Sequence, residues 1–348
     1  MPTIVGKQVG PIGYGLMGLT AIQTPNSDEA NFTAIKTAIE SGCTFLNGAE
    51  FYGTDPEENS LTLLRRYFVK YPEDAERVAI NIKGGRDFKT LGFDGSPEGV
   101  ARSIEHSLEQ LGPVGRISQW GMARRDLSHD YEDETLASID GYVKSGRIDG
   151  ISTSEINATT LRSAARKFRI SALEIEVSLF HTDALTNGLC AACAELDIPV
   201  IAYCKYLVAK TILRVDDTPA PLGRGLLGGR VKRVNDLALD DMRRDLPWFK
   251  DENLQVNLEL VQKVEALARK KGCTPAQIAI NWLLALSKRP GMPVIIPIPG
   301  SSDPGRIKEN AAIIDLASED MAEIDGMLQG FVAAGDRYPA TQMKYLQL

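Results

Sequence analysis

Two residues of the sequence, Tyr52 and Lys83, could act together on a proton. Tyr52 follows one apolar, strand-like segment by a few residues, and Lys83 ends the next such segment. Adjacent parallel strands of a barrel place their carboxyl ends side by side. A buried ammonium beside a phenol favours the phenolate, so we expect a lowered pKa for Tyr52, which could then donate a proton to a developing alkoxide. The alternative is that Tyr52 packs in a core while Lys83 extends to solvent.

Short apolar segments alternate with amphipathic ones along the whole chain. The strand-like segments lie at residues 12–15, 44–47, 78–83, 116–120, 150–152, 173–177, 199–203 and 294–296. Helical signals follow them, for example Ser96-Pro97 at a helix start and Thr274-Pro275 at another. A proline cannot donate to a sheet, so we end the last strand at Ile296, before Pro297.

This alternation predicts an α/β fold, a (β/α)8 or TIM barrel that forms a single domain over residues 1–348. An open doubly wound sheet is disfavoured because no Gly-x-Gly-x-x-Gly follows the first strand. In a barrel, reacting residues lie at the carboxyl ends of the strands. That rule selects residues 47–52, Lys83, residues 120–124, Ser154, Glu155, Glu174, Tyr203 and residues 300–310.

The composition excludes several classes of protein. With 43% hydrophobic and 24% charged residues, the 348-residue chain is a folded globular protein rather than a disordered one. A net charge of −7 argues against nucleic acid as the main partner. Because no apolar run reaches the roughly 18–20 residues of a membrane span and no secretion signal opens the chain, we expect no membrane partner and a cytoplasmic location.

Cysteine and histidine do not follow a metal-binding pattern. Cys190 and Cys193 form a CxxC, but they lie in an amphipathic helical segment, and we expect them to pack there rather than to bind metal or cycle between redox states. The histidines, His106, His129 and His181, are widely separated. We therefore expect no metal site.

Longer motifs resemble the aldo-keto reductases. They are, in chain order, residues 45–53 (FLNGAEFYG), 82–85 (IKGG), 221–227 (PLGRGLL), 241–249 (DMRRDLPWF), 297–302 (PIPGSS) and 306–310 (RIKEN). The resemblance runs from about residue 8 to residue 330, with the motifs in the family's order. The opening residues 9–20 (VGPIGYGLMGLT), and the variant formed by Asn47 with residues 50–53, are most similar to the pyridoxal reductase branch.

The resemblance implies NADPH bound across the barrel mouth and an Asp-Tyr-Lys-His catalytic set. Tyr52 would be the acid, Lys83 its neighbour, Asn47 would take the aspartate position and Ala123 the histidine position. Asn47 removes a negative charge, which we expect to lower the pKa of Tyr52 further. Ala123 cannot donate to the carbonyl oxygen, a loss of about 3–4 kcal/mol of barrier stabilisation. The space that it leaves suits a ring-borne aldehyde that brings its own phenol.

The resemblance also implies the residues that hold NADPH. Ser154, Glu155 and Glu174 would surround the nicotinamide carboxamide, with Tyr203 stacked under the ring; two close carboxylates resist joint ionisation, so one of the glutamates would keep a proton. The remaining contacts would be Leu222, Gly223 and Gly225 along the pyrophosphate, and Gly300, Ser301, Arg306, Glu309 and Asn310 at a loop-to-helix junction. The guanidinium of Arg306 would favour NADP over NAD; otherwise Arg306 and Glu309 are an ordinary surface pair.

The implied function is reduction of a small-molecule aldehyde by NADPH, with pyridoxal to pyridoxine as the reaction and Tyr52 as the proton donor. The alternatives are another aromatic or sugar-like aldehyde, and a nucleotide-sensing partner protein without turnover, which the altered catalytic set favours and the retained Tyr52 and Lys83 oppose. Phe51, Trp120 and Ala123 are candidates for the substrate pocket, with core packing as the alternative for both aromatic residues. The oligomeric state is not fixed by the sequence.

One stretch departs from the family pattern. Extra residues at about 205–220 separate Tyr203 from the motif at 221–227. They are either a surface loop, which we expect to weaken NADPH binding, or a gene-model artefact in which a short intron is translated in frame. Sequencing of the transcript decides between the two.

Overall fold

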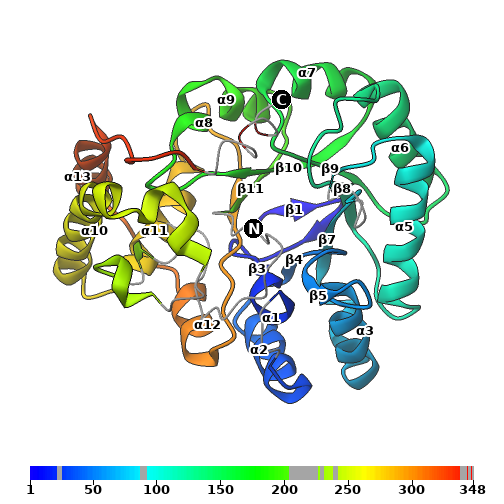
Figure 1. Cartoon of the computed structure of the whole chain (residues 1–348), viewed down its shortest axis with the longest axis horizontal. Helices are drawn as coiled ribbons and strands as arrows, with labels where there is room; N and C mark the ends of the chain where they lie inside the picture. The colour runs from blue at the N-terminus through cyan, green and yellow to red at the C-terminus, as the bar shows by residue number, and fades with distance from the viewer. Residues whose placement is uncertain are drawn as a thin grey trace.

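The predicted barrel is confirmed. The computed structural model describes residues 1–21, 26–86, 92–203, 226–227, 231–237, 242–337, 343 and 346. Eight strands form one parallel sheet in chain order, and Figure 1 shows them in the middle of the molecule with helices around them. The strands are β3 (Tyr14–Gly15), β4 (Phe45–Ala49), β7 (Ala79–Gly84), β8 (Gln119–Met122), β9 (Ile151–Ser154), β10 (Ile170–Glu176), β11 (Val200–Tyr203) and β12 (Ile295–Pro297).

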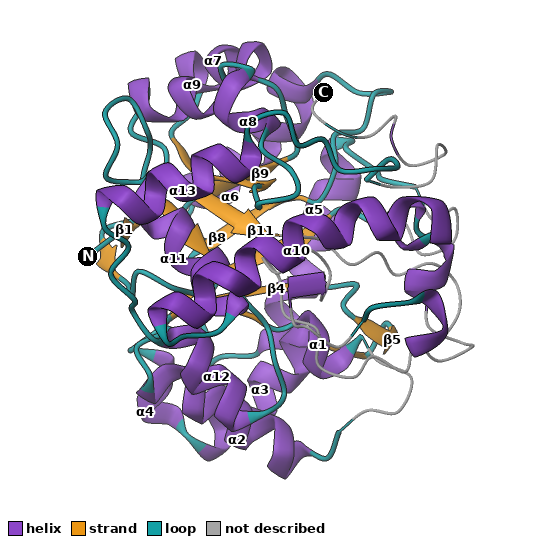
Figure 2. Ribbon diagram, turned by 90° about the vertical axis from the view of Figure 1, so that its left-hand side faces the viewer, coloured by secondary structure: helices purple, strands orange, loops and turns teal. Residues whose placement is uncertain are grey.

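Helices enclose this sheet, as the turned view of Figure 2 also shows. The longer ones are α2 (Asp28–Glu40), α3 (Ser60–Lys70), α5 (Pro97–Leu111), α6 (Ala137–Lys144), α7 (Ala158–Lys167), α9 (Leu189–Glu195), α10 (Asp251–Lys271), α11 (Pro275–Leu286), α12 (Pro304–Ala311) and α13 (Ser318–Leu328). Short elements complete the described chain: α1 (Met17–Thr20), α4 (Pro72–Ala75), α8 (Asp183–Thr186), the π-helix η1 (Tyr131–Leu136), the 3-10 turns η3 (Val234–Asp236), η4 (Met242–Asp245) and η5 (Pro247–Phe249), and the hairpins β1–β2 (Thr3–Ile4, Lys7–Gln8) and β5–β6 (Gly53–Asp55, Glu58–Asn59).

The helix starts follow from local capping. Ser96 accepts a hydrogen bond from the Gly99 amide at 3.0 Å, and α5 begins at Pro97 as predicted. Thr274 and Gln277 cap the start of α11 reciprocally. Cys190 and Cys193 are buried in α9 with free thiols, so the packing interpretation of the CxxC is confirmed. Within the described part of the chain, no helix is long and apolar enough to cross a membrane.

Hydrogen bonds between the first and last strands close the ring. The amides of Gly13 and Gly15 donate to the carbonyls of Pro297 and Pro299 at 2.9 and 3.1 Å. The Tyr14 hydroxyl donates to the Ser301 carbonyl at 2.5 Å. A Cβ at Gly300 would lie 2.6 Å from the Gly15 carbonyl oxygen, so only glycine fits where these segments meet.

The prediction that the last strand ends at Ile296 is wrong by one residue. Pro297 belongs to β12 and pairs with Ala202 of β11. Its carbonyl accepts from Gly13, and the next amide, that of Ile298, donates to Ala202 at 3.2 Å. A proline is tolerated at this strand end because the hydrogen bonds between the strands use its carbonyl and need no N–H donor at this position.

Side chains fill the interior of the barrel in layers. An apolar layer is made by Phe45, Ala79, Ala172, Ile201 and Ile296, and the N-terminal hairpin covers it with Ile4 and Val9. In Figure 2, β1 and the N-terminus lie at the left edge of the molecule. Residues two and four positions further along the strands are polar: Asn47, Asn81, Lys83 and Glu174. Because side chains of a strand alternate between its faces, these polar groups lie inside the ring toward its carboxyl end.

Replacing Tyr14 by Phe removes the hydroxyl that bonds across the closing strands. The buried Ser301 carbonyl then loses a donor, so we expect the free energy of unfolding to fall by about 1–3 kcal/mol. Urea unfolding followed by circular dichroism measures this loss. Tyr131→Phe is the matched control, because the hydroxyl of that buried tyrosine makes no hydrogen bond among the described residues. Equal losses in the two variants would contradict the closing role.

Candidate active site

The structure brings Tyr52 and Lys83 together at the mouth of the barrel, as predicted. Lys83 pairs with Ala49 at the carboxyl end of β4, and Tyr52 lies three residues beyond it. The Lys83 Nζ lies 5.2 Å from the centroid of the Tyr52 ring. Tyr52 and Lys83 are only 6% and 3% exposed, so the alternative in which Lys83 extends to solvent is wrong.

The expected lowering of the Tyr52 pKa is also wrong. Burial raises the pKa of Tyr52, and the nearby charges of Lys83 and Arg124, which lower it, do not outweigh burial. The carboxylate of Glu174 raises it as well. Tyr52 is therefore a protonated phenol at neutral pH that has a cation beside it, an arrangement suited to giving a proton to an oxygen placed against it.

Lys83 is held by a carboxylate from the other side of the ring. Glu174 of β10 contacts its ammonium with both oxygens, at 2.7 and 3.0 Å. Asn47 accepts from the same ammonium at 2.7 Å and donates to Glu174 at 2.7 Å. Asn81 donates to Glu174 at 3.1 Å. Glu174 was expected at the nicotinamide carboxamide, but its carboxylate contacts Lys83 instead. Glu174 thus places beside Lys83 the negative charge that Asn47 does not carry.

A second buried network surrounds Glu155. Its carboxylate accepts from the Tyr203 hydroxyl at 2.8 Å, from the Glu176 amide at 3.1 Å and from Arg337 at 3.1 Å. Arg337 also pairs with Glu176 at 2.8 Å. Glu155 has a φ of +53°, an uncommon left-handed conformation that its partners maintain. Arg337 comes from the segment after α13, so a residue far along the chain completes this end of the barrel.

The expectation that one of the two glutamates keeps a proton rested on a close pair of carboxylates, but Glu174 pairs with Lys83 and Glu155 pairs with Arg337. Burial alone would raise the pKa of Glu155, but the charges of Arg337 and Arg124 outweigh it and lower that pKa to about 2. Burial likewise would lower the pKa of Lys83, and Glu174 more than compensates, so the pKa of Lys83 is raised. Glu155 is therefore charged at neutral pH, and Glu174 forms a separate ion pair with Lys83.

Arg124, two residues beyond the end of β8, extends the network around Glu155 through Tyr203. Its guanidinium donates to the Ser154 hydroxyl at 3.2 Å and to the Tyr203 hydroxyl at 3.3 Å, and the residue is only 4% exposed. The strand-end rule selected Arg124 without giving it a role, and its place beside Ala123 is the signal that could have done so. Arg337 has no such signal, since no motif or spacing connects it to β9 or β10.

The candidates for the substrate pocket divide into two groups. Phe51 and Ala123 pack with Tyr52 and Ala49 in one small cluster, where the rings of Phe51 and Tyr52 meet edge to face at 5.2 Å. Trp120 faces away from this cluster: it is fully buried in the main core, and its indole donates to Ser107 of α5 at 3.4 Å. A pocket role for Trp120 is therefore wrong, and the core-packing alternative holds for it.

The residues expected at the far end of NADPH follow β12. Ser301 is buried, Arg306 is half-buried, and the Arg306 amide donates to Asp303 at the start of α12 at 2.8 Å. The carboxylate of Glu309 accepts from Thr274 at 2.7 Å and so joins α12 to α11. Gly300 and Asn310 lie at the two ends of the same junction. Leu222, Gly223 and Gly225, and the extra residues at 205–220, lie outside the described residues.

The donor set around Tyr203 matches a nicotinamide. A carboxamide presents two N–H donors and a carbonyl acceptor, and the Ser154 hydroxyl and the Arg124 guanidinium offer the complementary groups. Tyr203 is anchored through its hydroxyl, so its ring has a fixed orientation at the end of β11 on which a planar group can stack. These residues fit a nicotinamide nucleotide without Glu174.

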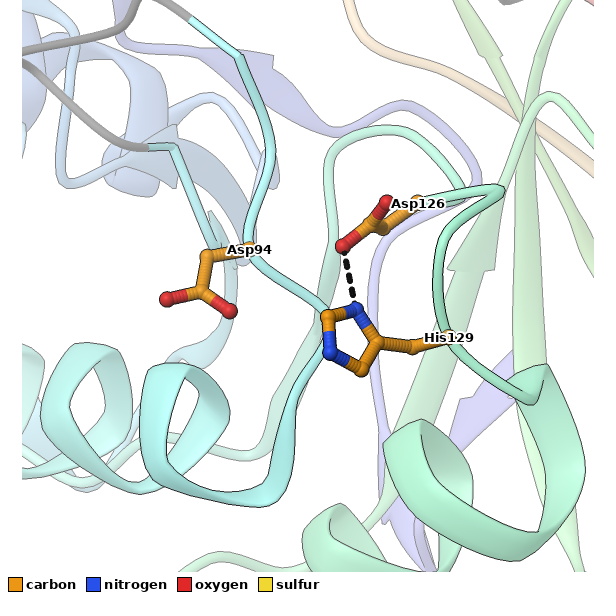
Figure 3. Close-up of side chains that lie close together, drawn as sticks. All are labelled: Asp94, Asp126 and His129. Carbon is orange, nitrogen blue, oxygen red and sulfur yellow. Dashed lines mark hydrogen bonds and ion pairs between the residues drawn. The ribbon is translucent and has the colours of Figure 1, made fainter.

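Three titratable residues lie close together on neighbouring loops: Asp94, Asp126 and His129 (Figure 3). A carboxylate oxygen of each aspartate and a ring nitrogen of the histidine lie within 4.8 Å of one another. Hydrogen bonds within the protein account for them. Asp126 accepts from the Ser128 hydroxyl at 2.6 Å, from the Gly95 amide at 2.9 Å and from His129 at 2.8 Å, and these contacts outweigh burial and lower its pKa to about 2. Asp94 accepts from Arg102 at 2.7 Å. The cluster therefore fastens the loops that follow β7 and β8 to each other.

Replacing Arg337 by Leu leaves Glu155 and Glu176 buried without their cation. We expect a loss of about 3–5 kcal/mol in the free energy of unfolding at pH 7. The loss should shrink as the pH falls toward 4. The wild-type Glu155 has a pKa of about 2 and stays charged at that pH. In the variant only Arg124 and Tyr203 still oppose burial, so the pKa of Glu155 rises, and the stability lost with Arg337 is smaller at a pH where this carboxyl becomes protonated.

Arg289→Leu is the matched control for this measurement, because it removes an exposed pair with Asp325 at 2.7 Å. Exposed pairs of this kind contribute about 0–1 kcal/mol. Urea unfolding at a series of pH values compares the two variants. Equal losses at pH 7, or a loss in Arg337→Leu that does not change with pH, would contradict the assigned network.

Comparisons with known proteins agree with this geometry. The profile of the aldo/keto reductase family matches residues 11–329. A protein of Schizosaccharomyces pombe named probable pyridoxal reductase 2 is 35% identical over 345 residues, 97% of each chain. A putative pyridoxal reductase of Saccharomyces cerevisiae is 33% identical and covers 94% of this chain and 95% of its own. Another S. pombe relative, 29% identical over 96% of this chain and 93% of its own, is named as an NADP(+) aldo-keto reductase.

Solved structures support the fold alone. A glycerol dehydrogenase from Gluconobacter oxydans superposes with a TM-score of 0.78 over 96% of each chain at 20% identity. A thermostable aldo-keto reductase studied with the inhibitor epalrestat gives a TM-score of 0.67 at 22% identity, over 94% of this chain and 98% of its own. With the family profile over nearly the whole chain and the relatives above 30% identity, the resemblance is confirmed: the chain belongs to the aldo/keto reductase family and is an oxidoreductase.

Proposed function

We propose that this protein reduces an aldehyde to an alcohol with NADPH and that pyridoxal is the substrate. The observation that carries the proposal is the buried, protonated Tyr52 phenol beside the buried Lys83 ammonium at the mouth of the barrel. A phenol held in this way can donate its proton to a substrate oxygen on which negative charge develops. The names of the relatives support pyridoxal as the aldehyde and NADP(+) as the cofactor.

NADPH, when bound, supplies the hydride. In this proposal Tyr203 supports the nicotinamide ring, Ser154 and Arg124 bind the carboxamide, and Glu155 keeps Tyr203 oriented. Arg306 at the start of α12 binds the 2′-phosphate, where a guanidinium and a helix N-terminus both favour an anion. The further contacts of the junction are Gly300, Ser301, Glu309 and Asn310, and those along the pyrophosphate are Leu222, Gly223 and Gly225.

Tyr52 moves the proton. As negative charge develops on the carbonyl oxygen of the substrate, the Tyr52 hydroxyl donates its proton to that oxygen and becomes a phenolate. Lys83 stabilises the phenolate through its charge, an effect that is large because both groups are buried. The retained acid and cation favour turnover over the nucleotide-sensing alternative.

The side chains around Tyr52 suit an aldehyde that carries its own hydrogen-bond donor. Ala123 is fully buried beside Tyr52 and has no polar group to offer the carbonyl oxygen. Phe51 and Ala49 make the same surface apolar, as a planar ring requires. Pyridoxal has a phenolic hydroxyl next to its aldehyde, and that hydroxyl replaces the donor that position 123 lacks.

Replacing Tyr52 by Phe removes the proton donor and leaves the shape of the site. We expect kcat to fall by about 10²–10⁴-fold, the usual contribution of a positioned acid, while the Kd for NADPH is unchanged. The loss of NADPH absorbance with pyridoxal measures turnover, and nucleotide fluorescence measures binding. Tyr142→Phe, on the outer helix α6, should keep wild-type turnover. Substantial residual turnover in Tyr52→Phe would remove Tyr52 as the acid, and a wild type that binds NADPH without turnover would favour the sensor.

Blocking the phenol of the substrate tests the choice of pyridoxal. 3-O-Methylpyridoxal keeps the ring and the aldehyde but cannot donate to the carbonyl oxygen. We expect its kcat/KM to be about 10²-fold below that of pyridoxal, comparable to the loss of one donor to a developing oxyanion. Equal values for the two aldehydes, or faster turnover of a sugar aldehyde, would contradict pyridoxal as the substrate and leave aldehyde reduction intact.

A further inference from the structure

We propose that Glu174 is the positioning residue for Lys83, and that it supplies from β10 the negative charge that position 47 lacks. The contact spans the inside of the barrel between residues 91 positions apart in the chain. It rests on the proposed function in one respect: Lys83 must take part in the reaction through Tyr52.

The first step of the argument is the burial of Lys83. An ammonium that is 3% exposed cannot be solvated by bulk water, and without a counterion it would lose its proton rather than remain charged. Glu174 contacts Nζ with both oxygens, at 2.7 and 3.0 Å, and is itself buried. No other carboxylate among the described residues forms an ion pair with Lys83. Glu174 thus keeps Lys83 charged and directs its side chain.

The second step is the orientation of Asn47. Its carbonyl oxygen accepts from Lys83 and its amide nitrogen donates to Glu174, both at 2.7 Å. An aspartate at this position would have no proton to donate and would place one carboxylate oxygen against another. Position 47 is therefore neutral because position 174 is charged, and the two residue types depend on each other.

The third step concerns what Glu174 does not do. Its oxygens are occupied by Lys83, Asn47 and Asn81, all of them buried inside the ring. The charge of Glu174 also raises the pKa of Tyr52 from a distance, but the groups that its oxygens contact are Lys83, Asn47 and Asn81, and the reacting partner among them is Lys83. Loss of Glu174 should therefore change the charge of Lys83 and the rate of proton transfer, with little change in the affinity for NADPH.

A charge transposition tests the proposal with four proteins: wild type, Asn47→Asp, Glu174→Gln and the double variant. We expect each single substitution to lower kcat with pyridoxal by about 10–100-fold, since the first crowds two carboxylates and the second leaves the ammonium unpaired. The double variant restores one carboxylate and one amide and should recover kcat to within about tenfold of wild type. The Kd for NADPH should stay near the wild-type value in all four proteins.

The pH profile separates positioning from a merely structural effect. Without Glu174, burial lowers the pKa of Lys83, so kcat of Glu174→Gln should fall at a lower pH on the alkaline side than that of wild type and recover as the pH is lowered. Glu323→Gln, which removes the exposed pair with Lys270 at 2.9 Å, is the matched control and should leave the profile unchanged. Additive losses in the double variant, or a wild-type rate and profile in Glu174→Gln, would overturn the proposal.

Two further outcomes remain decisive. If Glu174→Gln does not fold, recovery of both folding and kcat in the double variant supports the proposal, and a double variant that also fails to fold overturns it. If the wild type reduces no aldehyde, the proposed function fails by itself. The pKa of Lys83 is then measured by NMR of its labelled side chain. A Lys83 pKa that falls in Glu174→Gln and returns to the wild-type value in the double variant supports the proposal. An unchanged Lys83 pKa in Glu174→Gln shows that the counterion is not needed and overturns it.

Discussion

The barrel mouth depends on the burial of a single ammonium. A lysine inside a ring of strands keeps its charge only where a carboxylate and further acceptors surround it, and Glu174, with Asn47, meets that requirement from strands on different sides of the ring. The residues of the polar layer above the apolar core therefore depend on one another for their hydrogen-bond and charge partners. Removing any one member leaves a buried group without its partner, which costs more than the contact itself contributes.

Two charge networks divide the mouth between them. One joins Lys83 and Glu174 next to Tyr52, and the other joins Arg337 to Glu155 and Glu176 next to Tyr203. Lys83 is the paired cation of the first network and Arg337 that of the second, to which Arg124 is attached through Tyr203. The two buried carboxylates, Glu174 and Glu155, are thus each paired with a different cation. This separation lets the proton-donating side of the site and the stacking side be altered independently.

Local patterns in the sequence were sufficient for the architecture and for the meeting of Tyr52 with Lys83, because alternation and strand-end position are short-range properties. The outward direction of Trp120 was also accessible, since Gly121 and Ala123 alternate with it along the strand and Ala123 faces the site. The pairing of Glu174 and the arrival of Arg337 were not accessible. They depend on which buried charges meet across the ring, and such contacts leave no periodicity. The direction of the Tyr52 pKa shift was predicted wrongly, because burial raises this pKa while Lys83 lowers it. The size of the burial effect depends on the packing around the phenol, which the sequence does not reveal.

The position of Arg337 in the chain affects how the protein is made. Every barrel strand precedes it, so during synthesis the carboxylates of Glu155 and Glu176 leave the ribosome before the cation that neutralises them. Until it arrives, a closed ring would enclose two carboxylates without the cation that pairs with both of them, which disfavours closure of the barrel mouth. The ion pairs at this end of the barrel therefore complete the fold last, and a chain that ended before Arg337 would lack both of them.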